Sequence, residues 1–99
     1  MIIVMGTFRM PVQNLERALP MAEAVVMATR AEDGCIAYSY ARDLFDPEVI
    51  HVSEKWRDRA ALMAHFHSEH MKTWAAERGD LGLFGRDIRI FDTDEGEAV

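Results

Sequence analysis

Three histidines fall within a span of six residues in the second half of the chain, at His65, His67 and His70. An imidazole titrates near neutral pH, so a positioned histidine can take a proton from a bound molecule and return it. We expect His65 and His70 to act as base and proton shuttle, or to donate hydrogen bonds to a substrate oxygen. The structural alternative is that both bridge a helix junction through backbone carbonyls. His67 is expected to face solvent.

A metal centre is not predicted at these histidines. His65 and His70 are five residues apart across a predicted helix break, which is not a recognised spacing of metal ligands. In addition, the sequence fixes no carboxylate beside them.

Glu54 is an unusual carboxylate because it shares a strand face with Ile50, Val52 and Trp56. Burying an ionised carboxylate costs several kcal/mol unless it is paired. Arg42, on the neighbouring predicted strand, is the expected partner. The pair would either line a substrate pocket or serve only as a structural ion pair. A hydrogen bond from Glu54 to helix-end amides is the other structural interpretation.

Several aromatic side chains could form the walls of a pocket for a flat substrate. Trp56 ends a predicted strand, and Tyr38 and Tyr40 share one strand face, where their hydroxyls could orient a substrate oxygen. Phe66 and Trp74 come from the predicted helices. The structural alternative for all five is ordinary packing in the core or at a subunit interface.

Seven elements are predicted to position these side chains. Runs of β-branched and aromatic residues indicate strands over 2–10, 35–42, 48–56 and 86–92. Apolar spacing and capping residues indicate helices over 14–31, over 59–66, and from a Ser68 cap to about Arg78. Pro20 predicts a kink or a new helix start, Gly34 a left-handed turn, and Gly79 the end of the last helix.

The order of these elements, β-α-β-β-α-β, is that of the ferredoxin-like α+β fold. Right-handed crossovers would place the helices on one face of a four-stranded antiparallel sheet. The chain has 99 residues, enough for one domain, which we assign to residues 1–93. The remaining residues, 94–99, are acidic, and we expect this tail to be disordered.

Composition excludes some classes of partner. The formal net charge is −6, and the 11 Lys and Arg residues are spread along the chain, so a basic stripe for nucleic acid is absent. No apolar run approaches the roughly 20 residues of a membrane span. Cys35 is the single cysteine and is expected to be a small buried residue. These features favour the cytoplasm, with no nucleic acid and no membrane among the partners.

Both faces of the predicted sheet carry apolar side chains. In the first strand Ile3 and Met5 point one way, whereas Ile2, Val4 and Phe8 point the other. A solvated face would be polar, and the helices can cover only one face. We therefore expect a homodimer in which a second copy covers the other face.

Three ordered motifs resemble the antibiotic biosynthesis monooxygenase family, which includes small quinol monooxygenases. Residues 30–38 (RAEDGCIAY) are similar to its "R-x-E-x-G-C-x-x-Y" passage, and residues 54–56 (EKW) to its strand-ending "E-x-W". Residues 61–70 (ALMAHFHSEH) are similar to "A-L-x-x-H-x-x-S-x-H", so that His65 and His70 match the paired histidines. The resemblance covers about half of the chain.

The resemblance implies a dimeric α+β barrel with a pocket between sheet and helices in each protomer. Some members oxygenate phenols, anthrones or quinols with molecular oxygen and neither metal nor flavin, so it implies no cofactor. Others degrade haem or isomerise a sugar derivative. Two departures weaken individual mechanisms. Thr7 and Thr73–Ala76 stand near the places where haem-degrading relatives have an asparagine and a histidine, and Val52 stands where anthrone oxygenases have an asparagine.

The leading hypothesis is a cofactor-independent monooxygenase that oxidises a small aromatic or quinol with molecular oxygen. His65 or His70 would be the base. The first alternative is an isomerase or other proton-transfer enzyme that uses the same histidines without oxygen. The second is a non-enzymatic, small-ligand-binding module of a stress response.

Overall fold

The computed structural model describes residues 1–99 and contains four strands and three α-helices. In chain order these are β1 (Ile2–Arg9), a short 3-10 turn (Val12–Asn14), α1 (Leu15–Arg30), β2 (Cys35–Arg42), β3 (Val49–Trp56), α2 (Arg59–Phe66), α3 (Glu69–Asp80) and β4 (Phe84–Asp92). The predicted bounds of the strands and of α1 and α2 agree within two residues, and every predicted element is present.

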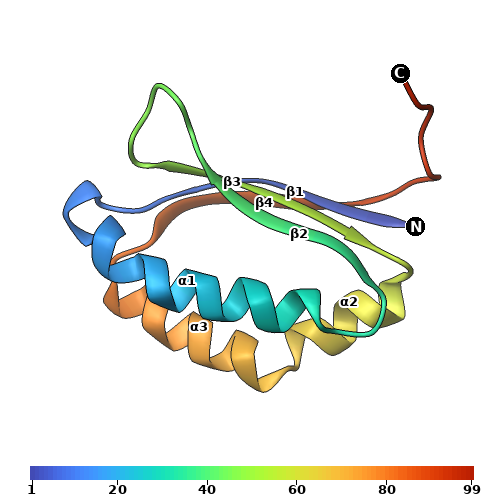
Figure 1. Ribbon diagram of the computed structural model, residues 1–99, viewed down its shortest axis with the longest axis horizontal. Coiled ribbons are helices and arrows are strands. Elements are labelled where there is room, and N and C mark those ends of the chain that lie inside the picture. Colours follow the sequence, from blue (N-terminus) through green and yellow to red (C-terminus); the bar gives the residue numbers. More distant parts are fainter.

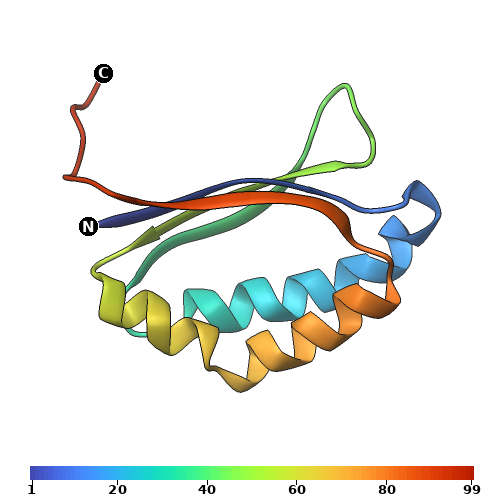
Figure 2. The same ribbon diagram turned by 180° about the vertical axis from the view of Figure 1, so that it is seen from behind.

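The four strands form one antiparallel sheet in the order β2-β3-β1-β4, with all three helices beneath one face (Figure 1). Seen from behind, α3 lies in front of α1, and β4 is the near edge of the sheet (Figure 2). The ferredoxin-like α+β fold predicted from the order of elements is thus confirmed. None of the helices is both long enough and apolar enough to cross a membrane.

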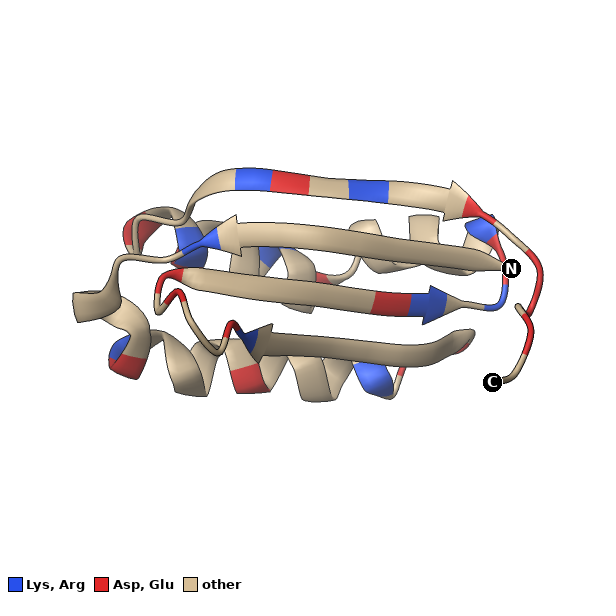
Figure 3. Cartoon of the chain, turned by 90° about the horizontal axis from the view of Figure 1, so that it is seen from above, with Lys and Arg blue, Asp and Glu red and all other residues tan.

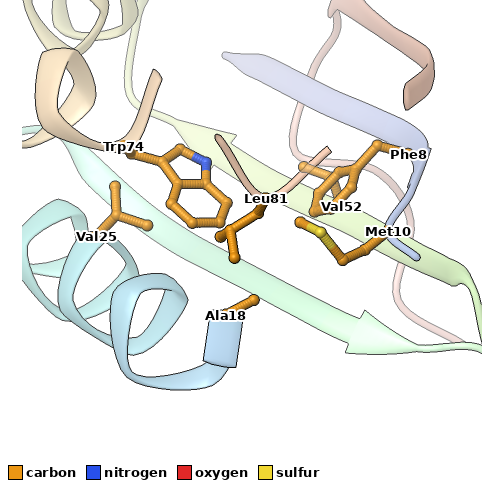
Figure 4. Close-up of a cluster of buried hydrophobic side chains, with 7 residues drawn as sticks. All are labelled: Phe8, Met10, Ala18, Val25, Val52, Trp74 and Leu81. Atoms are coloured by element: carbon orange, nitrogen blue, oxygen red, sulfur yellow. The ribbon is translucent and has the colours of Figure 1, made fainter. Parts of the chain in front are cut away.

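Strand alternation decides which side chains enter the space between sheet and helices. Ile2, Val4 and Phe8 of β1 are buried there, as are Val52 and Trp56 of β3. Two apolar clusters fill this space. We call the first the Trp74 cluster, shown in Figure 4; it comprises Phe8, Met10, Ala18, Val25, Val52, Trp74 and Leu81. The second, the Trp56 cluster, comprises Ile2, Val4, Tyr38, Trp56, Ala61 and Leu62.

Three local predictions need correction. Helix α1 runs unbroken through Pro20, because losing one backbone donor is outweighed by the packing of buried neighbours such as Val25. Helix α3 continues past Gly79 to Asp80, and Gly82 (φ +80°) supplies the left-handed turn instead. The strict alternation of β2 is interrupted between Cys35 and Ala37, where the register with β3 shifts.

The opposite face of the sheet, which we call the open face, carries no helix. Figure 3 views this face and shows that β1 and β2 bear a charged residue only where they end, at Arg9 and Arg42. Met5 and Phe91 remain 54% and 45% exposed there. The register shift also leaves Ile36 52% exposed, whereas Cys35 packs against the Trp56 cluster.

Candidate active site

A cavity of about 120 Å³ lies between the sheet and the helices and is lined by residues of all four strands and of α2 and α3. Ten of its 14 lining residues are hydrophobic, and the other four are Glu54, His65, Arg78 and Arg86. An apolar pocket with a few convergent polar groups is the usual form of a small-molecule site. The cavity is therefore the candidate active site.

His65 is the ionisable group held most firmly in this cavity. Its side chain is 1% exposed and packs between the rings of Tyr38 and Trp56, with ring centroids 5.4 and 4.9 Å away. Its Nδ1 lies 2.6 Å from Oε2 of Glu32. Because a carboxylate only accepts, Nδ1 carries the proton and donates it to Glu32. His65 Nε2 is then left as an acceptor, and it has no hydrogen-bond partner within the protein.

The charge state of His65 follows from burial. Desolvation lowers its pKa below the ordinary value of 6.5, and the hydrogen bond to Glu32 opposes this effect only in part. The imidazole is therefore neutral at pH 7, with a free lone pair on Nε2. A neutral, oriented and unpartnered nitrogen on a residue that lines a cavity has the form that a general base requires.

A glycine turn brings Glu32 to His65. The backbone amide of Glu32 donates to Thr29, and the amide of Cys35 donates to the carbonyl of Glu32, which closes the turn between α1 and β2. Gly34 adopts φ +85°, and a Cβ there would lie 2.5 Å from that of Ala61 on α2. Both the left-handed conformation and the close approach of α2 require glycine at this position.

His70 is the second histidine on Glu32, and its Nε2 donates to Oε2 across 3.1 Å. Glu32, His65 and His70 thus offer three potential metal-ligand atoms within 4.8 Å of one another, so the prediction that no carboxylate stands beside the histidines is wrong. Two ligands of one tetrahedral zinc ion, each about 2.0 Å from the metal, lie roughly 3.3 Å apart. The 2.6 Å separation of His65 Nδ1 and Glu32 Oε2 is instead hydrogen-bond spacing.

Glu54 is 8% exposed, and the indole nitrogen of Trp56 donates to its Oε1 across 2.9 Å. Burial raises the pKa of Glu54 to about 7, although this hydrogen bond and the charge of Arg86 act in the opposite direction. The predicted partner Arg42 is wrong. The Arg42 side chain donates to the carbonyl of Pro47, beyond the far end of β2. The register places Arg42 opposite Ile50, four pairs away from Glu54.

Tyr38 and Tyr40 extend the polar surface of the cavity. Their hydroxyl oxygens lie 2.9 Å apart, within hydrogen-bond distance. Burial raises the pKa of both phenols, so both hydroxyls keep their protons at neutral pH. One of them donates its proton to the other, which leaves one hydroxyl proton to donate to an oxygen of a bound molecule.

The structure divides the predicted site residues into two groups. Those that line the cavity are Tyr38, Tyr40, Glu54, His65 and Phe66. Those that do not are Arg42, Trp56, His70 and Trp74. Trp56 and Trp74 are 0% and 2% exposed and belong to the packed core, so neither forms a wall of the cavity.

Sequence reasoning missed three ionisable residues, Glu32, Arg78 and Arg86. Glu32 stood within the matched motif 30–38, which was a signal that could have identified it. Arg86 shares its strand face with Ile88 and Ile90, so the alternation of β4 also pointed to the cavity. Arg78 lies near the end of a helix whose packing no sequence pattern revealed.

Comparison with known proteins agrees with the fold and the motifs. The sequence model of the antibiotic biosynthesis monooxygenase family matches residues 1–77. Rv0793 of Mycobacterium tuberculosis, named as a candidate monooxygenase, is 34% identical over 73 residues, which cover 73% of this chain and 71% of Rv0793. YcnE of Bacillus subtilis, also named as a candidate monooxygenase, is 26% identical over 81 residues, covering 82% and 85% of the two chains.

Solved structures extend the similarity over the whole chain. A candidate antibiotic biosynthesis monooxygenase from Deinococcus radiodurans superposes with a TM-score of 0.92, covers 100% of this chain and 98% of its own, and is 22% identical. The structure of Rv0793 gives a TM-score of 0.79 with 26% identity over 99% of this chain and 98% of that one. With its matched motifs and its fold, this chain belongs to the antibiotic biosynthesis monooxygenase family.

Proposed function

We propose that this chain is a cofactor-independent monooxygenase that oxidises a small phenol or quinol with molecular oxygen, and that His65 is its general base. The observation that carries the proposal is His65 Nε2, a buried nitrogen without a partner, on a residue that lines an apolar cavity. An unpaired buried polar atom costs about 1–3 kcal/mol. A substrate hydroxyl that donates to Nε2 would remove this cost.

The first step is removal of the substrate proton. His65 Nε2 accepts the proton of a ring hydroxyl, and the resulting imidazolium is stabilised by the Glu32 carboxylate at Nδ1. The substrate becomes an electron-rich phenolate, which reacts with oxygen more readily than the neutral phenol. His70 does not line the cavity, so we assign it to positioning Glu32 rather than to the base role.

The second step forms the new carbon–oxygen bond. The ring of the anion gives electrons to molecular oxygen and becomes a hydroperoxide, whose oxygen–oxygen bond then breaks as water is lost. A simple quinol supplies all the electrons: one oxygen atom enters the ring of the resulting hydroxyquinone, and the other leaves in water with two hydrogens of the quinol. In the hydroxyl pair of Tyr38 and Tyr40, the member that accepts the hydrogen bond keeps its own proton to donate to a developing oxygen anion.

Cavity size limits the substrate. An engineered apolar cavity of about 150 Å³ in another protein holds one benzene molecule. The cavity here, at about 120 Å³, encloses no more than one ring, which favours a monocyclic substrate over a polycyclic anthrone or a haem. This supports a monocyclic phenol or quinol.

Homodimerisation through the open face is part of this proposal. Met5, Ile36 and Phe91 are about half exposed there, and β1 and β2 present a stretch without charge. A second copy stacked on this face would remove these side chains from water. Light scattering should give twice the chain mass, and Met5→Lys should reduce it toward the monomer. A monomeric wild-type protein would contradict this.

The test of the reaction is oxygen uptake with a monocyclic quinol, hydroquinone, with the product identified by mass. We expect the hydroxylated quinone, in contrast to the quinone and hydrogen peroxide of autoxidation. His65→Ala should lower the rate by about 10²–10⁴-fold. His70→Ala, which touches the same carboxylate outside the cavity, should lower it far less.

Two controls make this test decisive. Dialysis against a chelator should leave the rate unchanged; a rate that falls and returns with added metal would instead assign Glu32, His65 and His70 to a cation. A His65→Ala enzyme that oxidises quinol at the wild-type rate would remove His65 from the mechanism.

A second candidate function rests on the same pair of residues. A carboxylate-oriented histidine transfers protons equally well when no oxygen is present, so it also suits an isomerase. Turnover of a small hydroxylated or carbonyl metabolite under strict anaerobiosis would favour that function. A requirement for one molecule of oxygen per product would exclude it.

A further inference from the structure

The cavity contains two guanidinium groups that the proposed oxidation does not use. Arg78 and Arg86 both line it, and neither side chain makes a hydrogen bond or ion pair within the chain. Four other arginines pair with acidic side chains: Arg9, Arg57, Arg59 and Arg89. The two cavity arginines are thus left without an acidic partner, Arg78 half-buried and Arg86 exposed at the edge of the cavity.

The two arginines come from the end of the cavity opposite His65. Helix α3 begins at Glu69, beside the histidines, and Arg78 lies nine residues further along, or about 13 Å at 1.5 Å per residue. On β4, Ile90 pairs with Val4, the residue opposite Glu54, and Arg86 is four residues from Ile90. Four strand residues also span about 13 Å.

The local charge opposes that of the molecule as a whole. The chain carries a formal net charge of −6, yet its cavity holds two guanidinium groups against the single carboxyl of Glu54. Moreover, burial raises the pKa of Glu54 to about 7, so it supplies only part of one negative charge at neutral pH. Two like charges facing one small cavity repel each other, and an anion between them would relieve this.

We infer that the substrate is a single-ring phenol that carries an anionic group, a carboxylate, on the side of the ring away from the hydroxyl that faces His65. The inference rests on the proposed function, because that function places the hydroxyl at His65. Guanidinium groups bind carboxylates through paired, charge-assisted hydrogen bonds, which fixes both position and orientation. With its anionic end held by Arg78 and Arg86, the ring would present its hydroxyl to Nε2.

The experiment compares two probes of the same shape, 4-hydroxybenzoate and its neutral amide, 4-hydroxybenzamide, by calorimetric titration at pH 7.5 and low salt. A hydrogen bond to a charged group contributes about 1.5–3 kcal/mol, so we expect the carboxylate to bind at least about 10-fold more tightly. Arg78→Gln and Arg86→Gln should each reduce this preference, and the double variant should abolish it while binding the amide as before.

Arg89→Gln is the matched control, because Arg89 lies on the same strand but faces away from the cavity and contacts Asp87. It should keep the full preference for the carboxylate. Equal affinity of the wild-type protein for both probes, or binding of neither, would overturn the inference.

The outcome can be separated from that of the oxidation. Binding preference is measured without turnover, and His65→Ala should retain it because the two arginines remain. A preference without any oxygen uptake would leave the anion site standing and remove the oxygenase. Oxygen uptake from neutral quinols, without a binding preference for the carboxylate probe, would support the oxygenase and remove the anion site.

Discussion

The two apolar clusters beneath the sheet are built from similar residues but differ in what they enclose. Each has a tryptophan at most 2% exposed, Trp74 in one and Trp56 in the other. The Trp74 cluster supplies Phe8 and Val52 to the cavity wall, and none of its seven members is ionisable. The Trp56 cluster packs against two of the three buried polar residues of the chain, His65 and Glu54, both of which reach the cavity.

The difference shows where this small domain gives up stability. An apolar end contributes burial with no polar cost, whereas the Trp56 end holds a carboxyl with a raised pKa and an imidazole nitrogen without a partner. A neutral core would not retain such groups, because replacing them with apolar residues of the same shape is nearly neutral or stabilising. We conclude that the Trp56 end holds the groups proposed for proton transfer, whereas the Trp74 end contributes apolar wall to the same cavity.

The same substitution at both ends gives the largest expected effect. Leu81→Ala in the Trp74 cluster and Leu62→Ala in the Trp56 cluster each remove a side chain at most 1% exposed. Each should lower the free energy of unfolding by about 2–5 kcal/mol, measured by urea denaturation. Leu62 lies one turn before His65, so only Leu62→Ala should also lower turnover per folded molecule. Equal losses of turnover would abolish the distinction between the ends.

Glu54 should make the stability of the Trp56 end depend on pH. Its pKa rises from 4.5 in the unfolded chain to about 7 in the fold, so the native state binds more protons between these values. The stabilisation is complete below pH 4.5 and is lost as the pH rises through 7, by up to about 3 kcal/mol. Glu54→Gln keeps the acceptor for Trp56 and should remove this slope.

The measurement is the difference in unfolding free energy between wild type and Glu54→Gln at pH 5, 6, 7 and 8. His65, whose lowered pKa makes the fold lose stability as the pH falls below 6.5, is present in both proteins and cancels. A difference that stays constant with pH would mean that Glu54 is not buried as described.

The fold was predictable because each strand and helix follows a local pattern. The alternation of β1 and β3 correctly grouped Val4 with Phe8 and Val52 with Trp56, all of them buried beneath the sheet, and Ser68 caps α3 as predicted. The predictions that failed concern contacts between residues far apart in the sequence, or irregular backbone. The register shift after Cys35 cannot be recognised from alternation alone.

The site was predictable only in part for the same reason. His65 was found from its residue type and motif, but its partner Glu32 lies 33 residues away and meets it only because the Gly34 turn approaches α2. Arg42 was chosen for Glu54 as the nearest opposite charge on a neighbouring strand, whereas the structure satisfies Glu54 with the indole of Trp56. Polar pairing within a core is a three-dimensional property that sequence spacing does not determine.

Glu32→Gln tests whether the polar end is oriented by its carboxylate. The amide can donate to Nδ1 and so place the proton on Nε2, which would remove the base. We expect turnover to fall by about 10- to 100-fold, the loss seen when a carboxylate that orients a metal-binding histidine is removed. The Glu32 hydrogen bond raises the pKa of His65, so its loss should lower that pKa further. In a plot of the remaining activity against pH, the fall at low pH should then move to lower pH. A merely structural role would leave the position of that fall unchanged.

Tyr40→Phe gives the smallest expected effect, and it tests the seam between the two ends, because Tyr40 packs against both clusters. The ring and its edge-on contact with Phe8 would remain, while the hydroxyl bond to Tyr38 is lost. Loss of one such bond should cost about 1 kcal/mol in urea denaturation. If the hydroxyl pair also holds the substrate oxygen, KM should rise while the pH dependence set by His65 stays the same. A change in stability alone would restrict the active end to His65 and Glu32.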